Sequence, residues 1–254
     1  MRLGSTDINR IGLGTNRLTD TEQHRAFVAK ALAAGVNFID TAYLYARGES
    51  ETTIGALAPF PEGVVVATKG GFDDARPEAL RAQIGESLRR LRTDTVDLYY
   101  LHRVDQEVPL ERSVEAIDEA RRSGKLRHIG LSEVDVGQIE RARQVTPIAA
   151  VQNRYSLRER KYEEVIDYCE REQILFVPFY PLGGRRGLSS EDLQEIAARR
   201  DATTSQIALA WLLKRSGAIV PIPGTLSLEH LRENIAAPEI ELTDEEFDAL
   251  RHVQ

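Results

Sequence analysis

The segment VVVATKGGFDDARPEALRAQIGESLRRLRTDTVDLYYLH, residues 64–102, contains the pattern that decides the fold. It begins with a β-branched apolar run, Val64–Ala67, which is typical of a buried strand. A helix is predicted over Pro77–Leu91, because proline favours the first helical position and apolar residues then recur at helical spacing. A second apolar run follows at Val96–Leu101. A strand, a helix and another strand form the repeating unit of α/β folds.

The same alternation continues along the whole chain. Eight apolar runs predict strands at Ile11–Leu13, Val36–Ile39, Val64–Ala67, Val96–Leu101, Ile129–Leu131, Ile148–Val151, Ile174–Val177 and Ile219–Ile222. Amphipathic segments predict helices at Thr21–Ala34, Pro77–Leu91, Pro109–Arg122, Tyr162–Glu172, Glu191–Arg200, Ser205–Arg215, Ser227–Ala237 and Thr243–Val253.

Eight units in 254 residues predict a (β/α)8 TIM barrel that forms a single domain over residues 1–254 and ends in a C-terminal helix. The segment Arg2–Arg10 predicts a short N-terminal β-hairpin at the barrel floor. A doubly wound open sheet is the alternative, but Gly12-Leu13-Gly14 lacks the third glycine of a dinucleotide fingerprint.

Composition excludes several classes of protein. The chain has 33 Lys plus Arg against 40 Asp plus Glu, a net charge of −7, so no nucleic-acid partner is expected. A single cysteine, Cys169, rules out an intramolecular disulfide and a cysteine zinc cluster, and we expect no metal. No apolar stretch approaches the roughly 18 residues that span a bilayer, and the N-terminus lacks an apolar signal core. We therefore expect a cytoplasmic protein, a monomer or weak homo-oligomer, without membrane contact.

Polar side chains stand where the predicted strands end. Asp40, Lys69 and His102 end three consecutive strands, and Tyr45 follows Asp40 by five residues. In a barrel, the carboxyl ends of the strands carry the chemistry, so these side chains can converge. A Tyr phenol with a pKa of about 10 becomes a better proton donor when a nearby ammonium lowers that pKa. We expect Lys69 to lower the pKa of Tyr45, Asp40 to anchor Lys69, and His102 to hydrogen-bond a carbonyl oxygen.

These residues lie in motifs that resemble the aldo-keto reductase family. The matching pieces are Asp40–Tyr45 with Ser50-Glu51, Ala67–Lys69, Asp97–His102, Ile129–Ser132, Val151–Asn153, Pro178–Gly183, Ile222–Thr225 and Leu231–Asn234. The resemblance implies reduction of an aldehyde or ketone by a nicotinamide cofactor. It assigns Tyr45 as general acid, tuned by Lys69 and Asp40, and His102 as the residue that orients the carbonyl.

The resemblance also implies a cofactor site. Ser132 and Gln152 match the positions that hold the carboxamide. Phe179 matches the aromatic residue that stacks on the nicotinamide ring, and Tyr180 and Leu182 match positions that line the pyrophosphate path. The remaining expected contacts are Gly224, Thr225, Ser227, His230, Glu233 and Asn234. A glycine-containing loop before a helix suits phosphate independently of the resemblance, because it exposes backbone N–H groups.

Three departures from the family pattern affect the expected specificity. Glu133 stands where the family often has Asn, and Gly224 and His230 stand where it often has Lys and Arg around the 2′-phosphate. NADPH is expected, with NADH not excluded. The chain ends soon after its last helix, which favours an open substrate pocket.

Expected substrate contacts come from Tyr43, Arg47, Arg103 and Tyr155. Aromatic residues beside arginines suit an aromatic aldehyde such as pyridoxal, and parts of the chain resemble bacterial pyridoxal-reductase-like members. Three interpretations remain open for Arg185 and Arg186: they clamp the cofactor pyrophosphate, they bind an anionic substrate, or they are solvated charges on a loop.

Two other functions remain open. The barrel could sense nicotinamide nucleotide as a regulatory subunit with little turnover. Lys69 could instead form a Schiff base, although an Asp partner should keep its amine charged and poorly nucleophilic.

Overall fold

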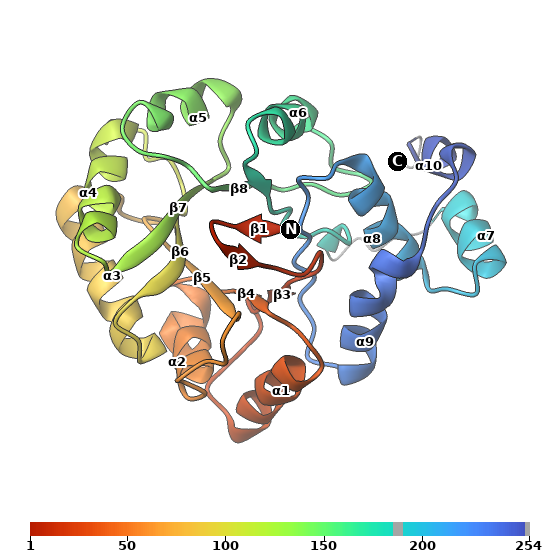
Figure 1. Cartoon of the computed structure of the whole chain (residues 1–254), viewed down its shortest axis with the longest axis horizontal. Coiled ribbons are helices and arrows are strands. Elements are labelled where there is room, and N and C mark those ends of the chain that lie inside the picture. Colours follow the sequence, from red (N-terminus) through yellow and green to blue (C-terminus); the bar gives the residue numbers. More distant parts are fainter. Residues whose placement is uncertain (185–189, 252–254) are drawn as a thin grey trace.

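A curled parallel sheet occupies the centre of the computed structural model, which describes residues 1–184 and 190–251. Seven strands pair in sequence order, each with the next along the chain. They are β3 (Leu13–Gly14), β4 (Phe38–Asp40), β5 (Val65–Gly70), β6 (Val96–Leu101), β7 (Leu126–Ser132), β8 (Ala150–Gln152) and β9 (Leu175–Phe176). Figure 1 looks down this sheet and shows helices surrounding it. The predicted barrel architecture is confirmed.

The eighth predicted strand, Ile219–Ile222, closes the barrel but forms no regular strand. It joins β9 through a bridge between Phe176 and Ile219, and the next residues join β3 through a bridge between Gly14 and Gly224. Gly12 N–H donates to Pro221 O at 2.9 Å, and Gly14 N–H donates to Pro223 O at 3.3 Å. Pro221 and Pro223 have no N–H to donate to carbonyl groups of the first strand, so the ladder toward β3 stays incomplete.

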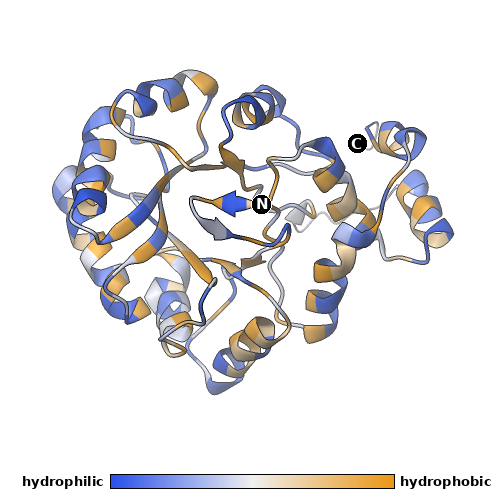
Figure 2. Ribbon diagram, viewed as in Figure 1, coloured by the Kyte–Doolittle hydropathy of each residue, from blue (hydrophilic) through white to orange (hydrophobic). Residues whose placement is uncertain are grey.

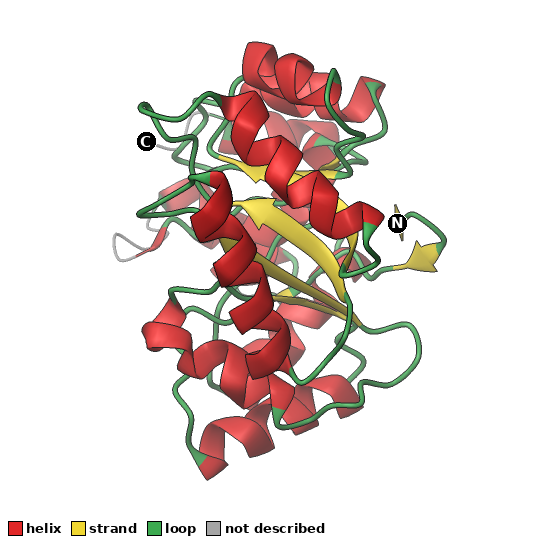
Figure 3. Cartoon of the chain, turned by 90° about the vertical axis from the view of Figure 1, so that its left-hand side faces the viewer, coloured by secondary structure: helices red, strands yellow, loops and turns green. Residues whose placement is uncertain are grey.

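Helices cover the outside of the sheet, as the side view in Figure 3 shows. Their bounds are α1 (Glu22–Ala33), α2 (Glu49–Gly55), α3 (Pro77–Leu91), α4 (Leu110–Arg122), α5 (Val136–Arg143), α6 (Glu163–Arg171), α7 (Glu191–Arg199), α8 (Thr204–Arg215), α9 (Leu228–Ala236) and α10 (Asp244–Leu250). Short 3-10 helices add η1 (Tyr45–Gly48) and η3 (Ala237–Glu239). The sequence prediction missed α2 and α5. None of the helices in the described residues combines the length and apolar composition needed to cross a bilayer.

Two apolar clusters stabilise the barrel. The inner one lies between the strands and includes Phe38, Leu98 and Tyr100, and the outer one lies between strands and helices. Figure 2 shows apolar residues concentrated along the strands and on the helix faces that turn toward them. This burial is the main contribution to the stability of the fold.

The predicted N-terminal hairpin is confirmed. Strands β1 (Arg2–Leu3) and β2 (Thr6–Asp7) pair antiparallel, and Leu3 joins the inner cluster. Asn37, just before β4, donates to Asp7 O at 3.0 Å. The hairpin therefore covers the amino ends of the strands and leaves the opposite end for a site.

Candidate active site

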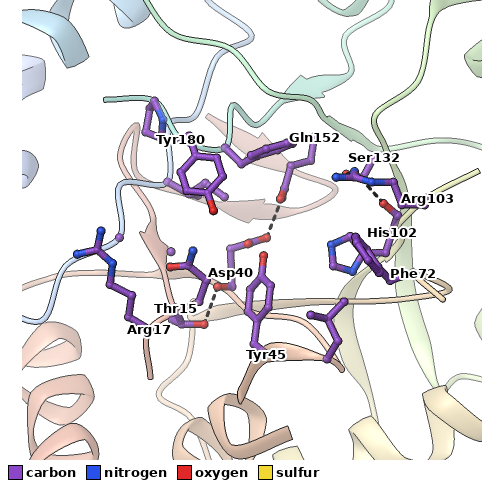
Figure 4. Close-up of a pocket in the computed structure, with 17 residues that line it drawn as sticks. Thr15, Arg17, Asp40, Tyr45, Phe72, His102, Arg103, Ser132, Gln152 and Tyr180 are labelled. Atoms are coloured by element: carbon purple, nitrogen blue, oxygen red, sulfur yellow. Dashed lines mark hydrogen bonds between the residues drawn. The ribbon is translucent and has the colours of Figure 1, made fainter. Parts of the chain in front are cut away.

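Four side chains meet at the carboxyl ends of β4, β5 and β6. Asp40 ends β4, Lys69 is the next-to-last residue of β5, His102 follows β6, and Tyr45 begins η1. Lys69 Nζ lies 5.2 Å from the Tyr45 ring centroid, and the Tyr45 and His102 ring centroids are 6.2 Å apart. Figure 4 shows the Tyr45 hydroxyl directed into the cavity with His102 beside it. The structure thus brings together the residues that the sequence placed at the strand ends.

Asp40 and Lys69 form an almost completely buried ion pair. Lys69 Nζ donates to Asp40 Oδ1 at 2.6 Å and to the Thr41 carbonyl oxygen at 2.6 Å. Gln152 Nε2 donates to Asp40 Oδ2 at 2.8 Å. Burial raises the pKa of Asp40, while Lys69 and the Gln152 hydrogen bond act in the opposite direction. The carboxylate is held on both oxygens, which fixes the ammonium beneath Tyr45 and makes Lys69 a poor Schiff-base nucleophile.

The acidity of Tyr45 differs from the sequence expectation. Burial raises the pKa of the Tyr45 phenol, and the charge of Lys69 only partly offsets that increase. Lys69 lowers the pKa of Tyr45 as expected, but the net shift is upward, because desolvation penalises the phenolate more than one ammonium stabilises it. The phenol consequently stays protonated at neutral pH, in the form that a proton donor requires.

His102 is a neutral imidazole in this site. Burial, followed by the charges of Lys69 and Arg103, lowers the pKa of His102 to about 2. Its Nδ1 is buried and finds no hydrogen-bond partner among the described residues. A neutral imidazole carries one N–H, so His102 can donate a hydrogen bond to a ligand but supplies no charge.

An arginine from α3 anchors the loop that carries Tyr45. Arg90 Nη1 donates to the Tyr43 carbonyl oxygen at 2.9 Å and to Glu51 Oε2 at 3.2 Å. Its guanidinium lies 4.5 Å from the Tyr43 ring centroid. Gly48 has φ +94°, and a Cβ there would collide with the Arg90 guanidinium. The loop conformation and the position of Arg90 therefore depend on one another.

A cavity of about 310 Å³ opens above these side chains. Its lining residues come from the ends of several strands: Gly14, Thr15, Asn16, Arg17, Asp40, Leu44, Tyr45, Phe72, His102, Arg103, Ser132, Gln152, Phe179, Tyr180, Pro181, Ile222 and Gly224. Thr15, Asn16 and Arg17 were not among the residues predicted from the sequence. They follow β3, so the strand-end rule applied to the first strand could have found them.

Several predicted cofactor contacts lie in or beside this cavity. Ser132, Gln152, Phe179, Tyr180 and Gly224 line it. Gln152 commits Nε2 to Asp40, so Oε1 is the atom that it can offer to a ligand N–H.

The remaining predicted contacts extend away from the cavity. Ser227 caps α9 by accepting a hydrogen bond from His230 N–H, and Thr225 Oγ1 accepts one from Ser227 N–H at 3.0 Å. Glu233 is half-buried and Asn234 is buried on α9, whereas Leu182 packs against the outer apolar cluster.

A close approach of two backbone segments shapes the cavity floor. A Cβ on Gly14 would lie 2.6 Å from Ile222 O and 3.5 Å from Gly224 N. Only glycine permits this contact, which leaves the loop at Gly224 free to present its backbone before α9.

The predicted substrate residues do not all reach the cavity. Arg103 lines it, whereas Tyr43 lines a smaller cavity of about 80 Å³ behind His102. Arg47 is exposed and is not among the described lining residues. Tyr155 is 0% exposed and its hydroxyl donates to Glu163 at 2.6 Å, so its predicted place in the substrate pocket is corrected.

Two other sequence features bear on the site. Glu133, which stands where the family often has Asn, accepts a hydrogen bond from Arg154 N–H at 2.7 Å and does not line the cavity within the described part of the chain. Arg185 and Arg186 lie outside the described residues.

Comparisons with known proteins agree with this geometry. The chain is 38% identical to an uncharacterised oxidoreductase of Schizosaccharomyces pombe, over 98% of this chain and 88% of that protein. It is 37% identical to pyridoxine 4-dehydrogenase of Escherichia coli, over 98% of this chain and 96% of that protein.

Solved structures show the same relationship. A thermostable aldo-keto reductase in complex with the inhibitor epalrestat superposes with a TM-score of 0.90 at 34% identity, covering 100% of this chain and 99% of the other. An aldo-keto reductase from Klebsiella pneumoniae in complex with NADPH gives 0.86 at 32% identity, covering 96% and 90%. Residues 10–254 match the model of the aldo/keto reductase family, and the chain belongs to that family.

Proposed function

We propose that this protein is an NADPH-dependent reductase that converts an aldehyde to an alcohol, with Tyr45 as the general acid. The observation that carries the proposal is the buried Asp40–Lys69 pair, whose ammonium lies 5.2 Å from the ring centroid of a protonated tyrosine facing the cavity. Bound NADPH supplies the hydride that the carbonyl carbon accepts. The Klebsiella pneumoniae relatives bind NADP or NADPH, which supports this choice of cofactor.

The chain's own residues provide binding and proton transfer. The Tyr45 hydroxyl and the His102 ring lie beside one another in the cavity, and both can donate a hydrogen bond to a carbonyl oxygen held there. Negative charge that develops on this oxygen draws the proton from Tyr45. The Lys69 ammonium then stabilises the phenolate, and Asp40 keeps Lys69 in place. After turnover, Tyr45 recovers its proton from solvent.

The cavity fits a nicotinamide nucleotide. The Ser132 hydroxyl and Gln152 Oε1 offer polar atoms for a carboxamide, and Phe179 offers an apolar ring surface. Phosphate groups suit the segment from Gly224 through Thr225 to the capped start of α9. We propose that NADPH is preferred over NADH, with Arg232, Thr225 and Ser227 replacing the Lys and Arg that the family often places near the 2′-phosphate.

An aromatic aldehyde such as pyridoxal is the proposed substrate. Phe72 is 46% exposed beside His102, at 5.0 Å between ring centroids, and can cover a flat ring. The similarity to a protein named pyridoxine 4-dehydrogenase supports this choice.

The test is loss of NADPH absorbance with pyridoxal, in the wild type and in two tyrosine variants. Tyr45→Phe removes the proposed acid, so turnover should stop while NADPH binding, followed by calorimetry, persists. Tyr168→Phe is the matched control, because its hydroxyl accepts a hydrogen bond from Arg143 on the outside of the barrel. Full turnover by Tyr45→Phe would refute the assignment. NADPH binding without turnover of any aldehyde in the wild type would favour the nucleotide-sensing function.

A further inference from the structure

The cavity concentrates positive charge in an acidic protein. The chain carries a net charge of −7. Asp40 is the one acidic residue among the described residues that line the cavity, and it is neutralised by Lys69. Arg17 and Arg103 also line the cavity, and Figure 4 shows them on opposite sides of Tyr45. Such a cavity attracts anions.

Arg17 and Arg103 occupy different parts of the site. Arg17 follows Asn16, whose side-chain oxygen lies beside the loop at Gly224, so it belongs to the side proposed for the cofactor phosphates. Arg103 follows His102 directly and reaches Ser132, on the side proposed for the carbonyl and the carboxamide. The charge of Arg103 is therefore available to bind an anionic group other than the cofactor phosphates.

Arg103 is a half-buried cation without an acidic partner in the described part of the chain. Its Nη1 donates to His102 O at 3.2 Å and to Ser132 Oγ at 3.4 Å. Its guanidinium lies 5.4 Å from the Phe72 ring centroid and 5.9 Å from that of Phe179. Arg90, by contrast, pairs with both Glu51 and Glu86. Since a guanidinium has five N–H donors, Nε and Nη2 of Arg103 remain for a ligand.

We propose that Arg103 recognises an anionic group on the substrate, so that the enzyme prefers aldehydes bearing a carboxylate or phosphate. The inference rests on the proposed function. A carbonyl at Tyr45 and His102 places the body of a flat substrate against Phe72, which contacts both the His102 ring and the Arg103 guanidinium. A planar guanidinium can bind either anion through two parallel hydrogen bonds.

The experiment compares substrates that differ in charge. 4-Carboxybenzaldehyde is paired with methyl 4-formylbenzoate, and pyridoxal 5′-phosphate with pyridoxal. The measured quantity is the ratio of kcat/KM for the anionic aldehyde to that for its neutral partner, with NADPH saturating. In the wild type this ratio should exceed one for at least one pair, and the larger ratio distinguishes carboxylate from phosphate.

Three variants test whether Arg103 itself sets this ratio. Arg103→Gln removes the charge and should lower the ratio about 10–100-fold, the range of a charge-assisted hydrogen bond. Arg103→Lys keeps the charge and should retain part of the preference. Arg17→Gln removes the same charge from the opposite side; it should weaken NADPH binding and leave the ratio unchanged.

The outcomes separate this inference from the proposed function. An unchanged ratio in Arg103→Gln overturns the inference, as does an equal fall in Arg17→Gln, which would indicate long-range attraction only. If Arg103→Gln loses kcat/KM equally for charged and neutral aldehydes and also binds NADPH more weakly, Arg103 acts on the cofactor, and the inference is again overturned. If the wild type reduces no aldehyde, both proposals fail, whereas turnover with an unchanged ratio removes only the role of Arg103.

Discussion

Replacement of Arg90 by methionine tests how the fold holds the proposed acid in position. The side chain of Glu51 is 0% exposed and that of Arg90 is 14% exposed, so this is a largely buried ion pair. Removing one partner of such a pair costs about 3–5 kcal/mol, because the other charge stays buried without a counter-ion; Glu51 would keep the hydrogen bond from Thr68. For a domain of this size, that loss corresponds to a fall in melting temperature of about 6–20 °C.

We also expect Arg90→Met to slow the chemical step. Arg90 holds the carbonyl of Tyr43, two residues before Tyr45, and the loop between them and α2 has positive φ at Ala46, Arg47 and Gly48. Without this anchor the loop can relax, and a displacement of about 1 Å at a reacting group costs about 100-fold in rate. The assay is single-turnover oxidation of NADPH with enzyme in excess, well below the melting temperature of the variant, with NADPH affinity measured separately.

A double variant separates stability from positioning. Glu51→Gln with Arg90→Met removes both buried charges and should recover much of the lost stability. It does not restore the hydrogen bond to Tyr43, so the single-turnover rate should stay low. A wild-type single-turnover rate in folded Arg90→Met would refute the positioning argument, and so would a rate that recovers together with stability in the double variant.

Two further predictions concern pH and the distal side of the barrel. The pKa of His102 is lowered to about 2 and that of Tyr45 is raised, so neither group should titrate between about pH 6 and 9. The rate of carbonyl reduction should therefore be constant over this range and fall only when Tyr45 loses its proton. The rate of alcohol oxidation, which needs the Tyr45 phenolate, should rise with pH. An inflection near pH 6.5 in the pH–rate profile would contradict the neutral assignment of His102. Trp211→Ala should lower the free energy of unfolding by about 3–5 kcal/mol without changing kcat, because the indole stacks on Phe247 at 5.2 Å and donates to its carbonyl oxygen at 3.1 Å. Denaturant unfolding that shows a loss below about 1 kcal/mol would contradict this packing argument.

The barrel and the convergence of four side chains could be predicted because both follow from periodicity. Apolar runs in parallel strands bring their carboxyl ends to one edge, so Asp40, Lys69 and His102 needed only their positions in the sequence to be placed together. The same rule would have found Arg17 after β3.

Other features depend on burial, which periodicity does not reveal. The direction of the Tyr45 pKa shift results from desolvation of the buried phenol. Tyr155 follows a strand end but turns into the barrel wall, where its ring lies 5.9 Å from that of Phe176. Helix α5 was missed because its eight residues bury only Ile139 and Ala142, which is too weak a period. Helix α2 was missed because the residue before it is a glycine with positive φ, which offers no capping side chain to mark the start of the helix.

The prolines at the barrel closure make one boundary of the sheet weaker than the rest. The β6–β7 pairing keeps a continuous register from Leu98 to Leu101, whereas Gly12 and Gly14 donate to Pro221 and Pro223, which have no N–H of their own to donate toward β3. Local opening follows the density of backbone hydrogen bonds, so the amides of Gly12 and Gly14 should exchange with deuterium before those of β6. A ligand that contacts both Gly14 and Gly224 would stabilise the closed pairing and slow this exchange. At a concentration one hundred times its Kd, it would raise the free energy of local opening by about 2.7 kcal/mol. If the cofactor binds across Gly14 and Gly224 as proposed, its binding and the closure of the barrel will be thermodynamically coupled.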